Sequence, residues 1–125
     1  MKNRITGDYK KKCILVTGMH RSGTSSVAGA LSTLGFTTGD NPMPPNEFNE
    51  KGYYEDIDVS TLNDKILDYF GRKWDSIYPF KIEKNDLFKT EIQLIFNEKF
   101  GNSLVSILKD PRFSLTFTIW QSALS

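Results

Sequence analysis

The sequence predicts an α/β fold built on a parallel sheet with helical crossovers. Two short aliphatic runs, Cys13–Thr17 and Leu104–Leu108, are typical of buried strands. Each run leads through a short polar loop into a segment with apolar residues at helical spacing. Strand, loop and helix therefore recur near both ends of the chain, which favours a three-layer arrangement with helices on both faces of the sheet.

The segment after the first strand is expected to be a helix followed by a long loop. Gly23–Leu34 repeats apolar residues at helical spacing, and Gly35 fits a C-terminal stop. The next stretch, Thr37–Lys51, is rich in Gly, Pro and Asn and shows no periodicity. A loop of this length in a compact domain is usually functional or disordered.

Three more helices are expected, each begun by an Asp or Asn. The last of them starts with Asp110 as its N-cap and Pro111 as its first helical residue, and it runs toward Leu124. Order resumes over Tyr53–Phe70, which contains a helix capped by Asp56 or Asp58 and ended by Gly71. The other helix is expected over Leu87–Phe100, capped by Asn85 or Asp86 and ended by Gly101.

Length and composition predict one domain over residues 1–125, with a flexible N-terminus over residues 1–11. The net charge of +1 gives no support for a nucleic-acid partner. The single cysteine, Cys13, lies inside an apolar run, so we expect a core residue, no disulfide and a cytoplasmic location. No apolar run is long enough to predict a signal peptide or a membrane span.

A glycine-bounded loop, Gly18 to Ser26, follows the first strand directly. Its two glycines, Gly18 and Gly23, have the spacing of the nucleotide-binding motif G-x-x-x-x-G-K-[ST], so the fold is expected to be P-loop-like. Thr24 stands in place of the lysine, however, and the cation is Arg21, inside the loop. We therefore expect a phosphate site that does not hold the β- and γ-phosphates of a nucleoside triphosphate.

The expected phosphate ligands are backbone N–H groups, hydroxyls and one guanidinium. The alternative is a tight turn between strand and helix, with the Ser and Thr residues as caps. The strand before the loop, the helix after it and the loop's composition favour the anion site. The candidate residues are Gly18, Arg21, Ser22, Gly23, Thr24, Ser25 and Ser26.

A second candidate anion site follows the second strand, in the run Lys109-Asp110-Pro111-Arg112. Capping by Asp110 and Pro111 explains the middle of this run, but not why Lys109 and Arg112 flank it. Ligands of parallel sheets bind beyond the carboxyl ends of the strands. We therefore expect both candidate sites to face one crevice.

Together these motifs resemble the sulfotransferases that use 3′-phosphoadenosine 5′-phosphosulfate (PAPS). The run G-M-H-R-S-G-T-S resembles the family's 5′-phosphosulfate loop, with its R-x-G-T-[ST] core, and K-D-P-R resembles its 3′-phosphate element. The runs M-P-P-N and K-G-Y-Y-E-D, with Trp74, resemble a bacterial subgroup. The resemblance covers Ile14 to about Trp120 and implies the N-terminal half of a sulfotransferase fold.

The resemblance implies transfer of a sulfuryl group from PAPS, without a metal, to a hydroxyl or amine of a small-molecule or carbohydrate acceptor, leaving PAP. Arg21 would neutralise charge on the bridging oxygen, and the loop N–H groups with Thr24 and Ser25 would cradle the 5′-phosphate. Lys109 and Arg112 would hold the 3′-phosphate. The candidates for the base that deprotonates the acceptor are Glu55, His20 and Asp40, in that order.

The chain departs from the family pattern in two ways. Phe117 stands where the 3′-phosphate element usually has a serine, which Ser114, Thr116 or Thr118 could replace. Family members are also commonly about twice as long, so the chain is expected to be a fragment, to complete itself as a homo-oligomer, or to bind nucleotide without turnover. A non-catalytic nucleotide-binding module and a P-loop kinase of a small metabolite therefore stay open as alternatives.

Overall fold

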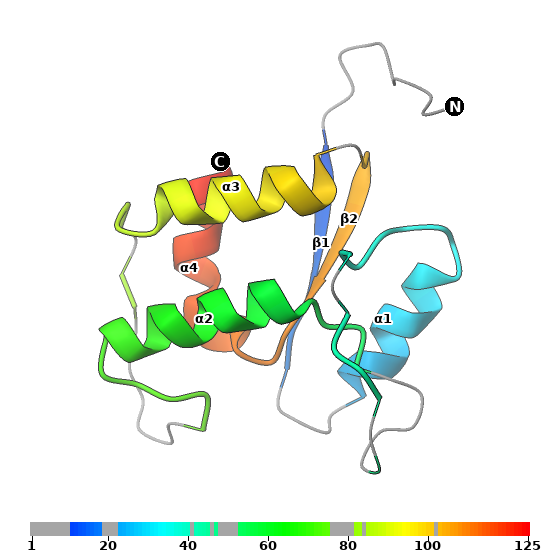
Figure 1. Ribbon diagram of the computed structural model, residues 1–125, viewed down its shortest axis with the longest axis horizontal. Coiled ribbons are helices and arrows are strands. Elements are labelled where there is room, and N and C mark those ends of the chain that lie inside the picture. Colours follow the sequence, from blue (N-terminus) through cyan, green and yellow to red (C-terminus); the bar gives the residue numbers. More distant parts are fainter. Residues whose placement is uncertain are drawn as a thin grey trace.

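The computed structural model describes residues 11–18, 23–40, 42–45, 47, 53–75, 82–83, 85–101 and 103–125. Within these residues the chain forms two parallel strands and four helices, so the predicted α/β class is confirmed (Figure 1). A P-loop-like three-layer fold stays a prediction. In chain order the elements are β1 (Lys12–Val16), α1 (Thr24–Ser32), α2 (Ile57–Tyr69), α3 (Lys89–Phe100), β2 (Val105–Lys109) and α4 (Phe113–Leu124).

The two strands lie side by side, with Ile14 opposite Ile107 and Val16 opposite Lys109. Successive side chains of a strand point to opposite faces, so paired residues share a face. One face of the sheet packs on α1 through a small core of Val16, Ala28 and Ile107. Because β1 and β2 are neighbours and parallel, the loops that follow them start at the same edge of the sheet.

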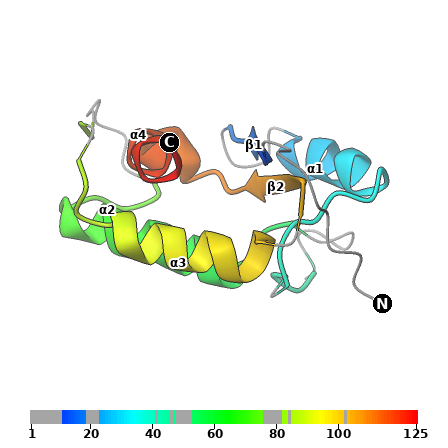
Figure 2. The same ribbon diagram turned by 90° about the horizontal axis from the view of Figure 1, so that it is seen from above.

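The other face of the sheet packs against the larger core, which α2, α3 and α4 build together. Figure 2 shows these three helices grouped on one side and α1 on the other side of the strands. Leu108 of β2 belongs to this core, and Leu15 of β1 packs against it. Its largest fully buried side chains include Phe100, Phe113, Trp120, Ile66, Leu67 and Ile92.

Local sequence signals account for the start of α2 and for the ends of α1 and α2. The Asp56 side chain caps α2 by accepting hydrogen bonds from the N–H groups of Asp58 (3.0 Å) and Val59 (3.3 Å), as predicted. Gly35 and Gly71 follow α1 and α2 with positive φ values of 86° and 67°, which glycine adopts at little cost.

The predicted starts of α3 and α4 were wrong. Neither Asn85 nor Asp86 caps α3, because the Asn85 side chain instead closes a separate turn by accepting a hydrogen bond from the Leu87 N–H (3.2 Å). The first helical residue is Lys89. Asp110 accepts a hydrogen bond from the Arg112 N–H (3.0 Å), but this also forms a turn, and α4 begins three residues later, at Phe113.

The described part of the predicted loop over Thr37–Lys51 is irregular, and it is attached to the fold at two points. The Ile107 N–H donates to the Thr37 carbonyl (2.8 Å), so β2 lies between β1 and Thr37. The Met43 N–H donates to the Glu55 carbonyl (2.7 Å). These bonds fix the segment that leads into α2 beside the end of the sheet.

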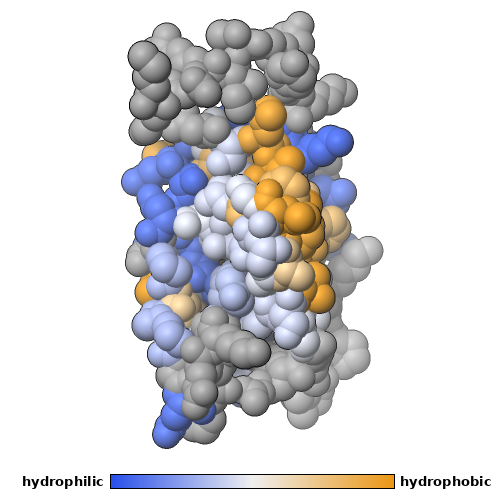
Figure 3. All heavy atoms as spheres, turned by 90° about the vertical axis from the view of Figure 1, so that its right-hand side faces the viewer, coloured by the Kyte–Doolittle hydropathy of each residue, from blue (hydrophilic) through white to orange (hydrophobic). Residues whose placement is uncertain are grey.

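The outer side of β1 and α1 is partly apolar. No other strand in the described part of the chain pairs with the free edge of β1. Cys13 is exposed on this strand, so the prediction of a core cysteine was wrong. Val27 and Leu34 are also exposed, and a hydrophobic strip runs beside hydrophilic residues in Figure 3. Because the sheet described has only two strands, β1 is an edge strand and is only partly covered. Its apolar run therefore does not place every residue in the core.

None of the described helices combines the length and the apolar character that crossing a bilayer requires.

Candidate functional site

The candidate site lies at the carboxyl ends of β1 and β2, where both predicted motifs begin (Figure 1). The Thr17 hydroxyl, just after β1, donates a hydrogen bond to the Asp110 carbonyl, just after β2 (3.4 Å). The two strand ends are therefore neighbours, as the prediction of a shared crevice requires. Of the first motif the structure describes Gly18 and Gly23–Ser26; His20, Arg21 and Ser22 lie outside the described residues.

The start of α1 suits an anion. Gly23 adopts a left-handed conformation (φ 90°) that turns the chain into the helix, and the first turn contains no acidic residue. The positive end of the helix dipole is therefore not offset by a carboxylate of its own helix. Ser26 is exposed and Thr24 half-buried, whereas the Ser25 hydroxyl donates to the Tyr53 carbonyl (3.3 Å).

Lys109 and Glu55 form a buried ion pair. The Lys109 Nζ lies 2.5 Å from the Glu55 Oε1, and the two side chains are only 3% and 5% exposed. The Lys109 ammonium also lies 6.0 Å from the centroid of the Tyr53 ring, within range of a cation–π interaction. The structure thus joins the first candidate base to one of the candidate 3′-phosphate ligands.

Burial raises the pKa of the Glu55 carboxyl above its ordinary value, although the hydrogen bond and the charge of Lys109 lower it. A carboxylate with a raised pKa holds a proton more strongly, which suits a general base. Glu55 cannot meet an acceptor hydroxyl, however, while it remains 4% exposed and bound to Lys109.

Arg112 turns toward α2 and is held by two carboxylates. Its Nε lies 2.6 Å from the Asp64 Oδ1 and its Nη1 lies 3.0 Å from the Asp110 Oδ1. Burial disfavours the guanidinium charge, but Asp110 and Asp64 outweigh that effect and raise the pKa of Arg112. The structure therefore does not bring Lys109 and Arg112 onto one open anion site, because each cation has its own carboxylate partners.

A buried polar network continues from Asp110 into the helices. The Asn63 amide nitrogen donates to the Asp110 Oδ2 (3.0 Å), and the Asn63 carbonyl accepts from the Thr116 hydroxyl (2.9 Å) and the Trp120 Nε1 (2.7 Å). Asn63, Asp110 and Thr116 are fully buried. This network connects the end of β2 with α2 and α4, so Asp110 has a structural role beside its turn.

The hydroxyls that could replace the missing serine are occupied by the protein. Ser114 donates to the Pro111 carbonyl (2.8 Å) and Thr118 donates to the Ile82 carbonyl (2.7 Å). Thr116 is fully buried in the Asn63 network, whereas Phe117 is exposed. Of the three candidates, Thr116 has no access to a ligand in this arrangement.

A second ion cluster ties the loop after α1 to α2 and α3. The Lys99 ammonium lies 2.5 Å from Asp40, 2.6 Å from Asp58 and 3.3 Å from Asp56. Burial disfavours the charged form of Lys99 and lowers its pKa, but the three carboxylates outweigh this effect and raise the pKa. Carboxylate oxygens of the three acidic residues lie within 4.8 Å of one another, and Lys99 supplies a positive charge among them. Asp40, the third candidate base, is therefore part of this cluster.

Gly39→Ala is expected to be more destabilising than Gly35→Ala, by about 1–3 kcal/mol. Both glycines have positive φ values, but a Cβ at Gly39 would collide with the Asp56 carboxylate of the Lys99 cluster, whereas one at Gly35 meets no atom within 4 Å. Urea unfolding of both variants measures the difference. Equal losses of stability would contradict the close approach of Gly39 to Asp56.

Three residues of the site were missed in the sequence. Tyr53 contacts both the Lys109 ammonium and, through its carbonyl, Ser25; Asp64 pairs with Arg112; Asn63 binds Asp110. Asn63 and Asp64 lie in an ordinary helical pattern and gave no local signal. For Tyr53 a signal was available, because it belongs to the K-G-Y-Y-E-D run and stands two residues before Glu55.

Comparisons of the chain with protein-family models, with curated proteins and with solved structures found no match.

Proposed function

We propose that this chain binds PAPS at the carboxyl ends of β1 and β2 and that it transfers the sulfuryl group to an acceptor hydroxyl or amine. The S–O bond to the 5′-phosphate would break, a bond from the acceptor oxygen or nitrogen to sulfur would form, and the acceptor proton would pass to a base. PAP would leave as the second product. In-line positioning and charge stabilisation, rather than covalent chemistry, would supply most of the rate.

The observation that carries this proposal is the juxtaposition of two motifs far apart in sequence. The loop with the R-S-G-T-S run follows β1, the K-D-P-R run follows β2, and the two strands are parallel neighbours. The first turn of α1 adds N–H groups that no acidic residue of that turn offsets. The resemblance of both motifs to those of PAPS-dependent sulfotransferases supports a phosphosulfate as the anion.

The two cations of the second motif would join the nucleotide in different ways. Asp64, the outer partner of Arg112, has a side chain that is 53% exposed, and ion pairs with such partners contribute little. A 3′-phosphate dianion can therefore replace Asp64 at Arg112. Lys109 would reach the nucleotide only by leaving Glu55, which would free the Glu55 carboxylate to accept the proton of the acceptor.

Arg21→Ala is expected to weaken PAP binding about tenfold to a hundredfold, because hydrogen bonds to charged groups contribute about 1.5–3 kcal/mol. Isothermal titration with PAP, AMP and ATP–Mg²⁺ measures the affinities. Lys89→Ala is the control, since it removes one positive charge from an exposed position on α3. PAP should bind more tightly than AMP, and transfer of labelled sulfate from PAPS to an acceptor tests turnover.

Preference for ATP–Mg²⁺ over PAP would overturn the proposal in favour of a small-metabolite kinase. The absence of binding to every nucleotide would overturn both enzyme functions.

A non-catalytic nucleotide-binding module is the second candidate, and the Glu55–Lys109 pair favours it. The two side chains neutralise each other in a buried position, so the first candidate base is engaged where the chemistry would need it. PAP binding without measurable sulfate transfer would support this candidate.

A further inference from the structure

The buried Glu55–Lys109 pair lies next to the start of α1. Lys109 is the last residue of β2, and its ammonium lies 6.0 Å from the centroid of the Tyr53 ring. The Tyr53 carbonyl accepts a hydrogen bond from the hydroxyl of Ser25, in the first turn of α1 (3.3 Å). Tyr53 thus connects the ion pair to the helix end at which an anion would bind.

The backbone around Glu55 is held at three points. The Met43 N–H donates to the Glu55 carbonyl (2.7 Å), and the residue after Glu55 caps α2 through its side chain. On the other side, Tyr54 has a positive φ of 56°, and a Cβ at Gly29 of α1 would lie 2.9 Å from its ring. Lys109, in contrast, has a long side chain that rotates freely when it is not paired. If the pair opens, we therefore expect Lys109 to move and Glu55 to stay buried.

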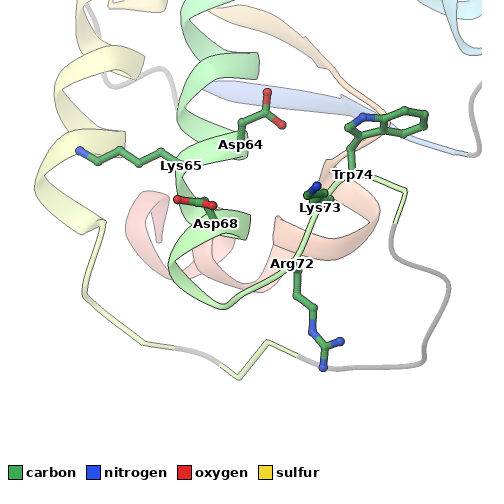
Figure 4. Close-up of a pocket in the computed structure, with 6 residues that line it drawn as sticks. All are labelled: Asp64, Lys65, Asp68, Arg72, Lys73 and Trp74. Carbon is green, nitrogen blue, oxygen red and sulfur yellow. The ribbon is translucent and has the colours of Figure 1, made fainter.

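The charges that remain around Glu55 would not stabilise a carboxylate there. Burial raises the pKa of Glu55, and the Asp110 carboxylate adds to this effect. Lys109 and Arg112 lower that pKa, but Arg112 is held by Asp64 (2.6 Å) and Asp110 (3.0 Å). Figure 4 shows the Asp64 carboxylate on the side of α2 that faces the segment after this helix. Arg112 is therefore directed to its own partners and does not replace Lys109.

We propose that an anion bound at the carboxyl ends of β1 and β2 draws Lys109 away from Glu55, and that Glu55 takes up one proton from solvent in exchange. The proton forms an O–H bond on the carboxylate, so the group that stays in the buried position is neutral. Because the complex holds more protons than the free chain, the anion binds more tightly as the pH falls. Only the identity of the anion, PAP, rests on the proposed function; the proton uptake rests on the ion pair.

Isotope-edited infrared spectroscopy tests the coupling directly. Glutamate labelled with carbon-13 at the side-chain carboxyl gives a shifted band when it is protonated, and Glu55→Gln shows which part of this band belongs to Glu55. The band is followed as the pH is lowered, without an anion, with PAP and with inorganic pyrophosphate. Its midpoint should lie at a higher pH when either anion is bound. Glu98→Gln, at an exposed position on α3, should leave the Glu55 band unchanged.

A second variant shows whether Lys109 is the group that moves. Lys109→Met has no ammonium to withdraw, so its Glu55 midpoint should already be raised in the free chain, and the anions should shift it less than in the unmodified chain. By titration calorimetry, the affinity of the unmodified chain for PAP should fall by up to about tenfold for each unit that the pH rises, which is the limit for one proton. The decrease should be smaller in Lys109→Met.

The two anions separate this inference from the proposed function. PAP binding without a shift of the Glu55 midpoint would overturn the coupling and leave the proposed function intact. A shift with pyrophosphate, in a chain that does not bind PAP, would keep the coupling and overturn the proposed function. The absence of binding to both anions would overturn both.

Discussion

Lys109→Ala is expected to lower the free energy of unfolding by about 3–5 kcal/mol, because removing one partner of a buried ion pair leaves the other charge uncompensated. The group left without its partner would be Glu55, whose side chain is 5% exposed and accepts a hydrogen bond from the Lys109 ammonium. Burial already raises the pKa of Glu55 and Lys109 opposes this effect, so removal of the ammonium should raise that pKa further. The loss of stability should therefore be smaller at lower pH, where the carboxyl takes up a proton. Urea unfolding at several pH values measures the loss and its pH dependence.

A double variant distinguishes the lost charge pair from lost packing. Lys109→Met combined with Glu55→Leu replaces both charged groups by apolar ones of similar size, and such replacements are often neutral or stabilising. It should therefore recover most of the stability that Lys109→Ala loses. Lys89→Ala, on the exposed side of α3, should change stability by less than about 0.5 kcal/mol. A cost below about 1 kcal/mol for Lys109→Ala would contradict a buried ion pair in solution.

Asn63→Leu is expected to cost about 2–5 kcal/mol, since each buried polar group left without a partner costs about 1–3 kcal/mol. The substitution keeps roughly the volume of the side chain but leaves the Trp120 Nε1 without its acceptor and the Asp110 Oδ2 without its donor. The Thr116 hydroxyl keeps a second acceptor, the Arg112 carbonyl, at 3.2 Å. The chain should thus lose the connection between the end of β2 and the packed helices.

The measurement is urea unfolding followed by the fluorescence of Trp120, which should also change in the folded state. Asn97→Leu is the matched control, because Asn97 is exposed on α3. Among the described residues, the same substitution there leaves no buried side chain without a hydrogen-bond partner. A free energy of unfolding equal to that of the unmodified chain would contradict the network.

The fold was predictable where the signals are local. Both strands were found within one residue, because short aliphatic runs in a small α/β domain have few alternatives. The Asp56 cap was found for the same reason, since its bonds reach only two and three residues ahead. The starts of α3 and α4 were not predicted correctly, because the side chains of Asn85 and Asp110 close turns that precede these helices. Sequence alone does not distinguish such a turn from an N-cap.

The candidate site was predictable as a location but not as a set of contacts. Parallel neighbouring strands bring the two motifs to one edge, and that follows from the order of elements. The partner of Lys109 is 54 residues away, and the carboxylate that holds the outside of Arg112 is 48 residues away. Such pairings depend on how α2 packs against the end of the sheet, which no local pattern encodes.

The run from Lys109 to Arg112 has a consequence for how such motifs are interpreted. Lys109 neutralises a buried carboxylate and Asp110 anchors the Asn63 network, so both residues are needed for folding whether or not a nucleotide binds. A variant of this chain that bound no nucleotide would therefore still need most of the run in order to fold. In the described part of the loop after β1, Gly23 makes the left-handed turn into α1 and the Ser25 hydroxyl binds the Tyr53 carbonyl, whereas Ser26 is exposed. Substitution of Ser26 should therefore cost less stability than substitution within the run after β2.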